Sequence, residues 1–176
     1  SNIQYDGSAS EPSDAGSYAV TADFLPLDTA NYNAVSGGSA GSFVINKAAT
    51  TTAVTCSAGP FVYNGAPHEP CEAVATGPAG LNLAVAVVYA DNTNAGTAGA
   101  DANYGGAANY FPSSGSTTFP IDKADPTLAI GNSPVTYDGT AKAAAVSGSV
   151  AGAVSGVKYD GAATEPIGAG SYVITA

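Results

Sequence analysis

Apolar and polar residues alternate along much of the chain. In residues 81–89 (LNLAVAVVY), every second side chain from Leu81 to Tyr89 is large and apolar, so these side chains share one face of an extended segment. Because successive side chains of a β-strand point to opposite faces of the sheet, this alternation predicts half-buried strands. Shorter runs show the same pattern at Tyr18, Val20, Ala22 and Phe24, at Phe43 and Ile45, and at Phe119 and Ile121.

Glycine and proline separate these strands at intervals of about 8–12 residues, which favours a β-sandwich or barrel over helices. Asp-Gly or Asn-Gly pairs follow Tyr5, Tyr63, Tyr137 and Tyr159. Such pairs predict tight hairpin turns, because Asn and Asp tolerate positive φ and glycine has no Cβ. Pro120 lies between two core-facing residues and has no N–H to donate, so its strand is expected at a sheet edge or a bulge.

Long stretches of the sequence occur twice. Residues 3–22 (IQYDGSASEPSDAGSYAVTA) return as residues 157–176 (VKYDGAATEPIGAGSYVITA), with twelve of twenty positions identical at an offset of 154. Two periods of about 77 residues account for this offset and predict a tandem array. Shorter motifs recur at about one period: FVINKA at 43–48 and FPIDKA at 119–124, PFVYNG at 60–65 and PVTYDG at 134–139, and ANY at 30–32 and 108–110.

This period divides the chain into three parts. We expect residues 1–47 to be the C-terminal part of one repeat, residues 48–123 a complete repeat, and residues 124–176 the N-terminal part of a third. Short linkers at INKA and IDKA predict an extended rod. Residues 124–156 and residues 1–47 together make about one repeat, so the end parts suit either a continuous array with covalent neighbours, which we favour, or head-to-tail complementation between chains.

The charge and composition exclude several functions. Only 10% of the residues are charged and the net charge is −10, with lysine as the sole basic residue apart from one histidine. Binding to nucleic acid or to an anionic membrane surface needs clustered Lys or Arg, and is therefore excluded. No apolar run approaches the ~20 residues of a membrane-spanning helix. Polar character that comes from Ser, Thr, Asn and Gly favours a secreted surface protein.

Cys56 and Cys71 are the only cysteines, and in a secreted β-protein such a pair predicts a disulfide, with free thiols as the alternative. Together with His68 and Glu72 they also suggest a zinc cluster. We disfavour it, because metal sites with cysteine pairs usually show C-x-x-C spacing. No nucleophile and base stand in a recognisable arrangement, so we expect no enzyme activity and no cofactor.

Several aspartates at strand ends and linkers could supply hard oxygen ligands for calcium. No D-x-D-x-D loop is present, and solvated turns explain these residues more simply. The calcium candidates are Asp28, Asp91, Asp101, Asp122 and Asp125.

An intramolecular isopeptide bond would use Lys47 or Lys123, although both look like linker residues.

Carbohydrate binding would need exposed aromatic side chains. Candidates surround the ANY motifs, but their recurrence with the repeat favours a role in the core or at a corner. They are Tyr32, Tyr104, Tyr110 and Phe111.

The motif at Asp14, Gly16 and Tyr18 resembles the D-x-G-x-Y corner of immunoglobulin-like sandwiches, in which the tyrosine hydroxyl bonds back to upstream backbone. The wider pattern YDG…AGSYVITA…ANY…FVINKA resembles the bacterial immunoglobulin-like repeats of the MBG/YDG type found in large surface proteins and adhesins. This resemblance implies all-β, tandem immunoglobulin-like sandwiches with structural corners at Tyr18 and Tyr172. The middle repeat departs from the pattern, since Ala98 occupies the tyrosine position.

The resemblance implies an extracellular location at a cell surface or in a secreted filament. The expected function is a structural repeat module of a stalk or filament, and the alternative is an adhesin module that binds a glycan or protein through its loops. The expected partners are neighbouring repeats of the same protein.

Overall fold

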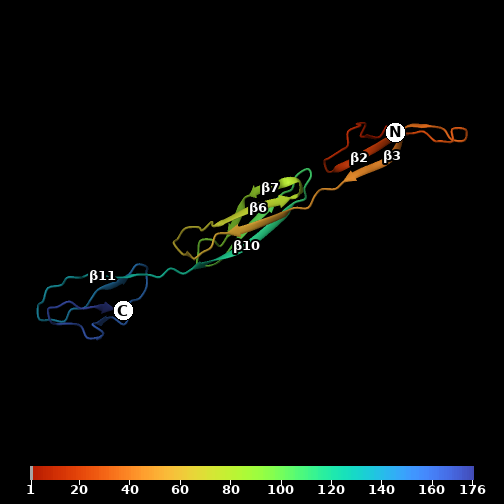
Figure 1. Ribbon diagram of the computed structural model, residues 1–176. Helices are drawn as coiled ribbons and strands as arrows, with labels where there is room; N and C mark the ends of the chain where they lie inside the picture. Colours follow the sequence, from red (N-terminus) through yellow and green to blue (C-terminus); the bar gives the residue numbers. More distant parts are fainter. Residues whose placement is uncertain (1) are drawn as a thin grey trace. The chain divides into compact units, whose positions relative to one another are not determined.

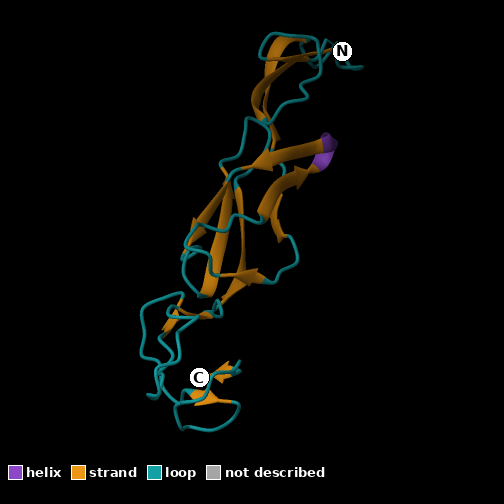
Figure 2. Cartoon of the chain, turned by 90° about the vertical axis from the view of Figure 1, so that its left-hand side faces the viewer, coloured by secondary structure: helices purple, strands orange, loops and turns teal. Residues whose placement is uncertain are grey.

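A computed structural model describes residues 2–176 of the chain. The chain divides into two compact units, residues 1–123 and residues 124–176. Both are built from strands, as the alternation predicts, and the described residues contain a single 3-10 turn, η1 (Pro78–Gly80) (Figure 2). No helix in the described part is long and apolar enough to cross a membrane.

Unit 1 begins with a three-stranded antiparallel sheet in the order β1-β2-β3 (Figure 1). Tyr5 of β1 stacks edge-on against Phe43 of β3, with 5.8 Å between the ring centroids. Register shifts on β2 after Val20 and Ala22 mark irregularities in its pairing with β3. Phe43 remains 46% exposed, so this sheet covers its apolar face only partly. Its strands are β1 (Gln4–Tyr5), β2 (Gly16–Phe24) and β3 (Val35–Ile45).

The middle repeat has two sheets, ordered β4-β6-β7 and β5-β10-β9-β8, which enclose the main core of unit 1. The core is rich in alanine: Ala98 and Ala100 of β9 are fully buried, and Phe119 and Ile121 of the neighbouring strand β10 belong to the same buried cluster. The arrangement is that of a β-sandwich. Its strands are β4 (Thr51–Cys56), β5 (Phe61–Val62), β6 (Cys71–Gly77), β7 (Leu81–Val85), β8 (Val87–Ala90), β9 (Gly96–Tyr104) and β10 (Ser113–Asp122).

The apolar run 81–89 forms two strands rather than one. It is interrupted at Ala86, so that β7 pairs with β6 in one sheet whereas β8 pairs with β9 in the other. The predicted half-buried face persists across this change of sheet: Leu81, Val85, Val87 and Tyr89 are half-buried, and only Leu83 departs from it, at 49% exposure.

Pro120 was expected at a sheet edge or a bulge, but it lies in β10, which has neighbouring strands on both sides. The parallel partner β5, however, pairs only with Ile121 and Asp122. Along the rest of β10, only β9 is hydrogen-bonded to it. Pro120 thus occupies a locally unpaired edge, which explains how a residue without an N–H is accommodated there.

Unit 2 contains two antiparallel pairs, β11 with β12 and β13 with β14. Tyr159 on β13 is its most buried large side chain, at 7% exposure. The strands are β11 (Leu128–Ile130), β12 (Val146–Gly148), β13 (Lys158–Tyr159) and β14 (Ile174–Thr175).

Candidate functional site

The first copy of the YDG motif forms a tight turn after β1. Asp6 and Gly7 both have positive φ, at 45° and 81°, and Tyr5 and Ser8 bond to each other through N–H and C=O in both directions. The carboxylate of Asp6 accepts a hydrogen bond from the N–H of Ala19 at 2.7 Å, which fixes the turn to β2. The aspartate therefore tolerates the turn geometry and also ties the turn to the neighbouring strand.

The second copy repeats these contacts in unit 2. Asp160 and Gly161 have φ of 46° and 84°, Tyr159 and Ala162 exchange the same pair of bonds, and Asp160 accepts from the N–H of Val173 at 2.8 Å. The duplicated sequence thus folds through the same local bonds in both units.

The turns that follow Tyr63 and Tyr137 are of another kind. Their side chains cap the chain two residues on: Asn64 accepts from the N–H of Ala66, and Asp138 accepts from the N–H of Thr140. In both turns only the glycine has positive φ, at 79° for Gly65 and 81° for Gly139.

The tyrosine of each D/G-x-G-x-Y motif bonds back to the loop before its strand. The hydroxyl of Tyr18 donates to the carbonyl of Asp14 at 2.7 Å, and that of Tyr172 donates to the carbonyl of Gly168 at 2.8 Å. A Cβ on Gly16 would lie 3.2 Å from the ring of Tyr18, so glycine lets the ring lie close over the chain. In the middle repeat the alanine at this position offers no such bond.

Cys56 and Cys71 are joined in a disulfide. They are direct partners at the last register position of the antiparallel pair β4–β6. Because the sulfurs are bonded to each other, neither is a thiolate ligand for zinc. His68 instead packs its ring against Phe61, at 5.7 Å between centroids. Within residues 2–176, no three His, Cys, Asp or Glu residues gather as a metal site would require.

The disulfide end of β6 is also held by a tyrosine from the opposite sheet. The hydroxyl of Tyr89 on β8 accepts from the N–H of Cys71 at 2.8 Å and donates to its carbonyl at 2.9 Å. In unit 2 the hydroxyl of Tyr159 accepts from the N–H of Ala144 at 2.8 Å. Sequence reasoning treated Tyr159 only as a turn marker and missed this bridging role, although a tyrosine at this place in each repeat was a usable signal.

The loop of residues 105–111 holds the linker that joins the first sheet to the middle repeat. The carbonyl of Asn109 accepts from the N–H of Ala48 at 2.8 Å, and the N–H of Phe111 donates to the carbonyl of Ala48 at 2.9 Å. The ammonium group of Lys47 donates to the carbonyl of Ala107 at 2.9 Å, so Lys47 serves as a linker contact here.

The side chain of Asn109 reaches back to the first repeat. Its Oδ1 accepts from the N–H of Ala15 at 2.7 Å, and its Nδ2 donates to the carboxylate of Asp14 at 2.7 Å. Sequence reasoning noted the ANY motif but assigned no partner to its asparagine.

The aromatic candidates for carbohydrate binding divide into two groups. Tyr104 is buried, and the hydroxyl of Tyr110 donates to the carbonyl of Pro78 at 2.8 Å, so both belong to the structure of the repeat. Phe111 is half exposed and Tyr32 is 66% exposed. Only the last two present a free ring face.

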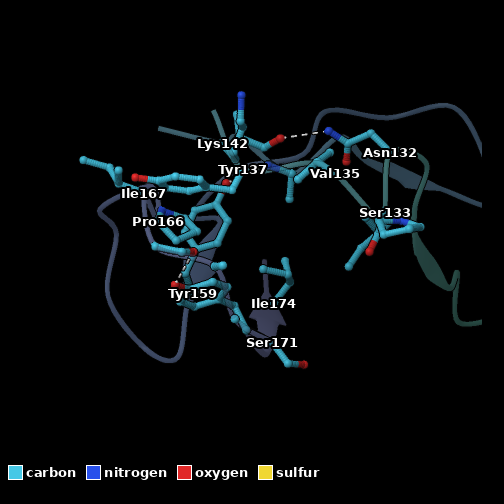
Figure 3. Close-up of a pocket in the computed structure, with 18 of the residues that line it drawn as sticks. Asn132, Ser133, Val135, Tyr137, Lys142, Tyr159, Pro166, Ile167, Ser171 and Ile174 are labelled. Carbon is cyan, nitrogen blue, oxygen red and sulfur yellow. Dashed lines mark hydrogen bonds between the residues drawn. The ribbon is translucent and has the colours of Figure 1, made fainter. Parts of the chain in front are cut away.

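Unit 2 contains a cavity of about 410 Å³ that is lined mostly by loop residues, together with Ile130, Tyr159 and Ile174 of its strands (Figure 3). Its apolar lining includes Val135, Tyr159, Tyr172 and Ile174. By the repeat, these four correspond to Phe61, Tyr89, Ala98 and Ala100 of the middle repeat, which pack around Phe119 and Ile121. The cavity therefore lies at the place that corresponds to the hydrophobic core of the middle repeat.

Two exposed aspartates are held ionised by local hydrogen bonds. The Lys142 side chain, 2.6 Å away, and then Thr140 lower the pKa of Asp138 well below its usual range. The Asn31 side chain lowers the pKa of Asp28. Both carboxylates accept hydrogen bonds from residues of their own turn, so their role is to hold the turn.

The fold and these contacts define an all-β, tandem-repeat protein whose recurring residues hold turns and corners. The family model of the MBG domain matches residues 1–50 and 126–176, together more than half of the chain. The chain therefore belongs to the MBG domain family. No curated protein and no solved structure gives a match. The MBG domain is typical of repeat modules in surface proteins, and the disulfide suggests an oxidising setting.

The disulfide should account for a measurable part of the stability of the middle repeat. Alkylation of the denatured, non-reduced protein should modify neither Cys56 nor Cys71, as checked by intact mass. The double variant Cys56→Ser, Cys71→Ser should lose about 3 kcal/mol in free energy of unfolding, as expected for a closed loop of this length. Reducing agent should shift the urea transition of the native sequence and leave that of the double variant in place. Two alkylatable thiols would contradict the assignment.

Removal of the Tyr89 hydroxyl should destabilise the same repeat without touching the disulfide. Tyr89→Phe leaves the N–H and the carbonyl of Cys71 without their partner, at a cost of about 1–3 kcal/mol. Urea unfolding followed by circular dichroism measures this loss. Tyr63→Phe is the matched control, because Tyr63 is 43% exposed in the same repeat. Equal effects of the two variants would show that the bridge contributes nothing specific.

Proposed function

We propose that this chain is a structural, extracellular repeat module that forms part of the stalk or filament of a bacterial surface protein. The observation that carries the proposal is the kind of residue that recurs. Asp6 and Asp160 hold the same turn, and Tyr18 and Tyr172 make the same corner bond. What the repeat preserves is the geometry of the backbone, which is what a spacer needs.

The electrostatic character supports the same proposal. A net charge of −10 with few basic residues suits a surface that stays soluble and avoids polyanions. In this proposal the chain has no catalytic role and needs no cofactor. The single histidine, His68, is explained by its packing on Phe61, and its Nε2 has no hydrogen-bond partner among the described residues. The partners are neighbouring repeats; head-to-tail association of separate chains remains a prediction.

The spacer proposal predicts an extended particle. Small-angle scattering of the 176-residue chain should give a radius of gyration clearly above the roughly 16 Å of a compact globule of this length. The physical reason is that short linkers keep successive repeats from folding back on each other. A radius close to the globular value, unchanged on dilution, would contradict a spacer role.

An adhesin role is the second candidate, and one loop favours it. At the end of β2 and in the loop to β3, four apolar side chains are each more than 60% exposed: Phe24, Leu25, Leu27 and Tyr32. Asp28 bonds to Asn31 inside this loop at 2.8 Å, which fixes its shape. Exposed apolar groups on an ordered loop are typical of binding surfaces.

The adhesin candidate predicts a loss of binding when this loop is made polar. The probe is a panel of immobilised glycans and extracellular matrix proteins, to which the native chain should bind. The double variant Leu25→Ser, Leu27→Ser should reduce that binding at least about tenfold, the effect of losing one or two buried methylene-rich contacts. Val88→Ser, at a 68% exposed position on β8, is the control. No binding by the native chain to any member of the panel would leave the spacer proposal in place and remove this one.

A further inference from the structure

The loop that contains the second ANY motif contacts the linker through its backbone, and it reaches the corner of the first repeat through one side-chain amide. Asn109 and its partners, Asp14 and Ala15, lie more than ninety residues apart in the sequence. The backbone N–H of Ala15 can only donate and the carboxylate of Asp14 can only accept, so the orientation of the amide is dictated by its partners. Both bonds are 2.7 Å long, and the one to the carboxylate is charge-assisted.

The residues on each side of this contact are also held in place by hydrogen bonds within their own part of the chain. On the first repeat, the carbonyl of Asp14 accepts from the Tyr18 hydroxyl, and Gly16 allows the ring to lie close over the corner. The same residue therefore offers its carbonyl to the corner tyrosine and its carboxylate to the next repeat.

On the middle repeat, the backbone of Asn109 is bonded to Ala48 of the linker, and Ala107 pairs with Tyr110 across the loop. Gly106 has φ of 83°, and a Cβ there would lie 2.9 Å from the carbonyl of Tyr110, so the loop requires glycine. Ordered groups on both sides lose little conformational entropy when they bond, which makes two hydrogen bonds effective.

We propose that the asparagine of the ANY loop is a clamp between successive repeats, and that the surface it recognises is the Asp-Ala-Gly corner of the neighbouring MBG-type repeat. The clamp fixes the orientation of the sheet β1–β3 relative to the sandwich of the middle repeat. This goes beyond the proposed function, because it describes how repeats are coupled whether the array is a spacer or an adhesin.

The repeated sequence gives the clamp a selectivity. The corners of the three repeats read Asp14-Ala-Gly, Asn94-Ala-Gly and Gly168-Ala-Gly. Aspartate and asparagine both carry a side-chain oxygen that accepts from the amide of the clamp, whereas glycine leaves only the backbone N–H that follows it. A corner with aspartate or asparagine can therefore receive both bonds, as Asp14 does, whereas a corner with glycine can receive only one.

The other ANY loop supplies a matched control within the same chain. Asn31 corresponds to Asn109, but its Nδ2 donates to Asp28 of its own loop at 2.8 Å. Removal of the Asn31 amide therefore disturbs a loop of the same type without touching the junction.

The test compares Asn109→Ala with Asn31→Ala in the full-length chain by nuclear magnetic resonance. Residual dipolar couplings from β1–β3 and from β4–β10 should fit one alignment tensor in the native chain and in Asn31→Ala, and two tensors in Asn109→Ala. The amide of Ala15 should exchange with solvent roughly tenfold faster in Asn109→Ala, as expected for the loss of one hydrogen bond. One shared tensor in Asn109→Ala, or two tensors in the native chain, would overturn the proposal.

A second set of variants approaches the contact from the other side, so that a local defect in the 105–111 loop is not mistaken for loss of the clamp. Asn109→Asp places two carboxylates together and should separate the tensors. The double variant Asn109→Asp, Asp14→Asn reverses donor and acceptor and should restore the single tensor. Asp14→Gly reproduces the third corner and should weaken the coupling, whereas Asp14→Asn should retain it. Failure of the reversed pair to restore coupling would refute recognition by these two side chains.

Discussion

Bonds from side chains to nearby backbone carry this fold, because its apolar core is thin. Alanine supplies much of the buried surface, and the core of the middle repeat contains only a few large side chains. Burial scales with apolar area, so alanine contributes far less than leucine or phenylalanine. Hydroxyl and carboxylate groups compensate by fixing strands to turns: Asp6 holds a turn to β2, Tyr18 holds a corner, and Tyr89 crosses from one sheet to the other.

The dependence of the fold on hydrogen bonds from side chains to backbone explains why the motifs of the repeat are polar. In most sandwiches the recurrent positions are core positions, since packing limits what can replace them. Here the residues shared between the two copies of the doubled segment include Tyr, Asp, Gly and Pro of turns and corners. The disulfide fits the same picture, because it adds a covalent tie to the one repeat in which Ala98 replaces the corner tyrosine.

Much of the local structure could be predicted from the sequence, and the tertiary partners could not. Alternation located β2, β3 and β10, and the YDG pairs at Tyr5 and Tyr159 located turns with positive φ. At residues 81–89 alternation predicted the half-buried face but not the division into two strands, since the pattern continues while the segment changes sheet at Ala86. The partners of Asn109 could not be predicted either. A motif shows that a residue recurs, but the groups that it bonds to depend on how two repeats pack against each other.

The disulfide also bears on how the chain responds to tension. In the proposed spacer role, tension acts along the backbone, and each unfolded residue adds about 3.3–3.6 Å of length when fully extended. The fifteen-residue separation between Cys56 and Cys71 is closed by the covalent bond, so this loop adds nothing to the extension of an unfolded middle repeat. The oxidised repeat therefore gains roughly 50 Å less length on unfolding than the same repeat with its bond reduced. In that role, the redox state of the two cysteines sets how far the middle repeat extends when it unfolds under tension.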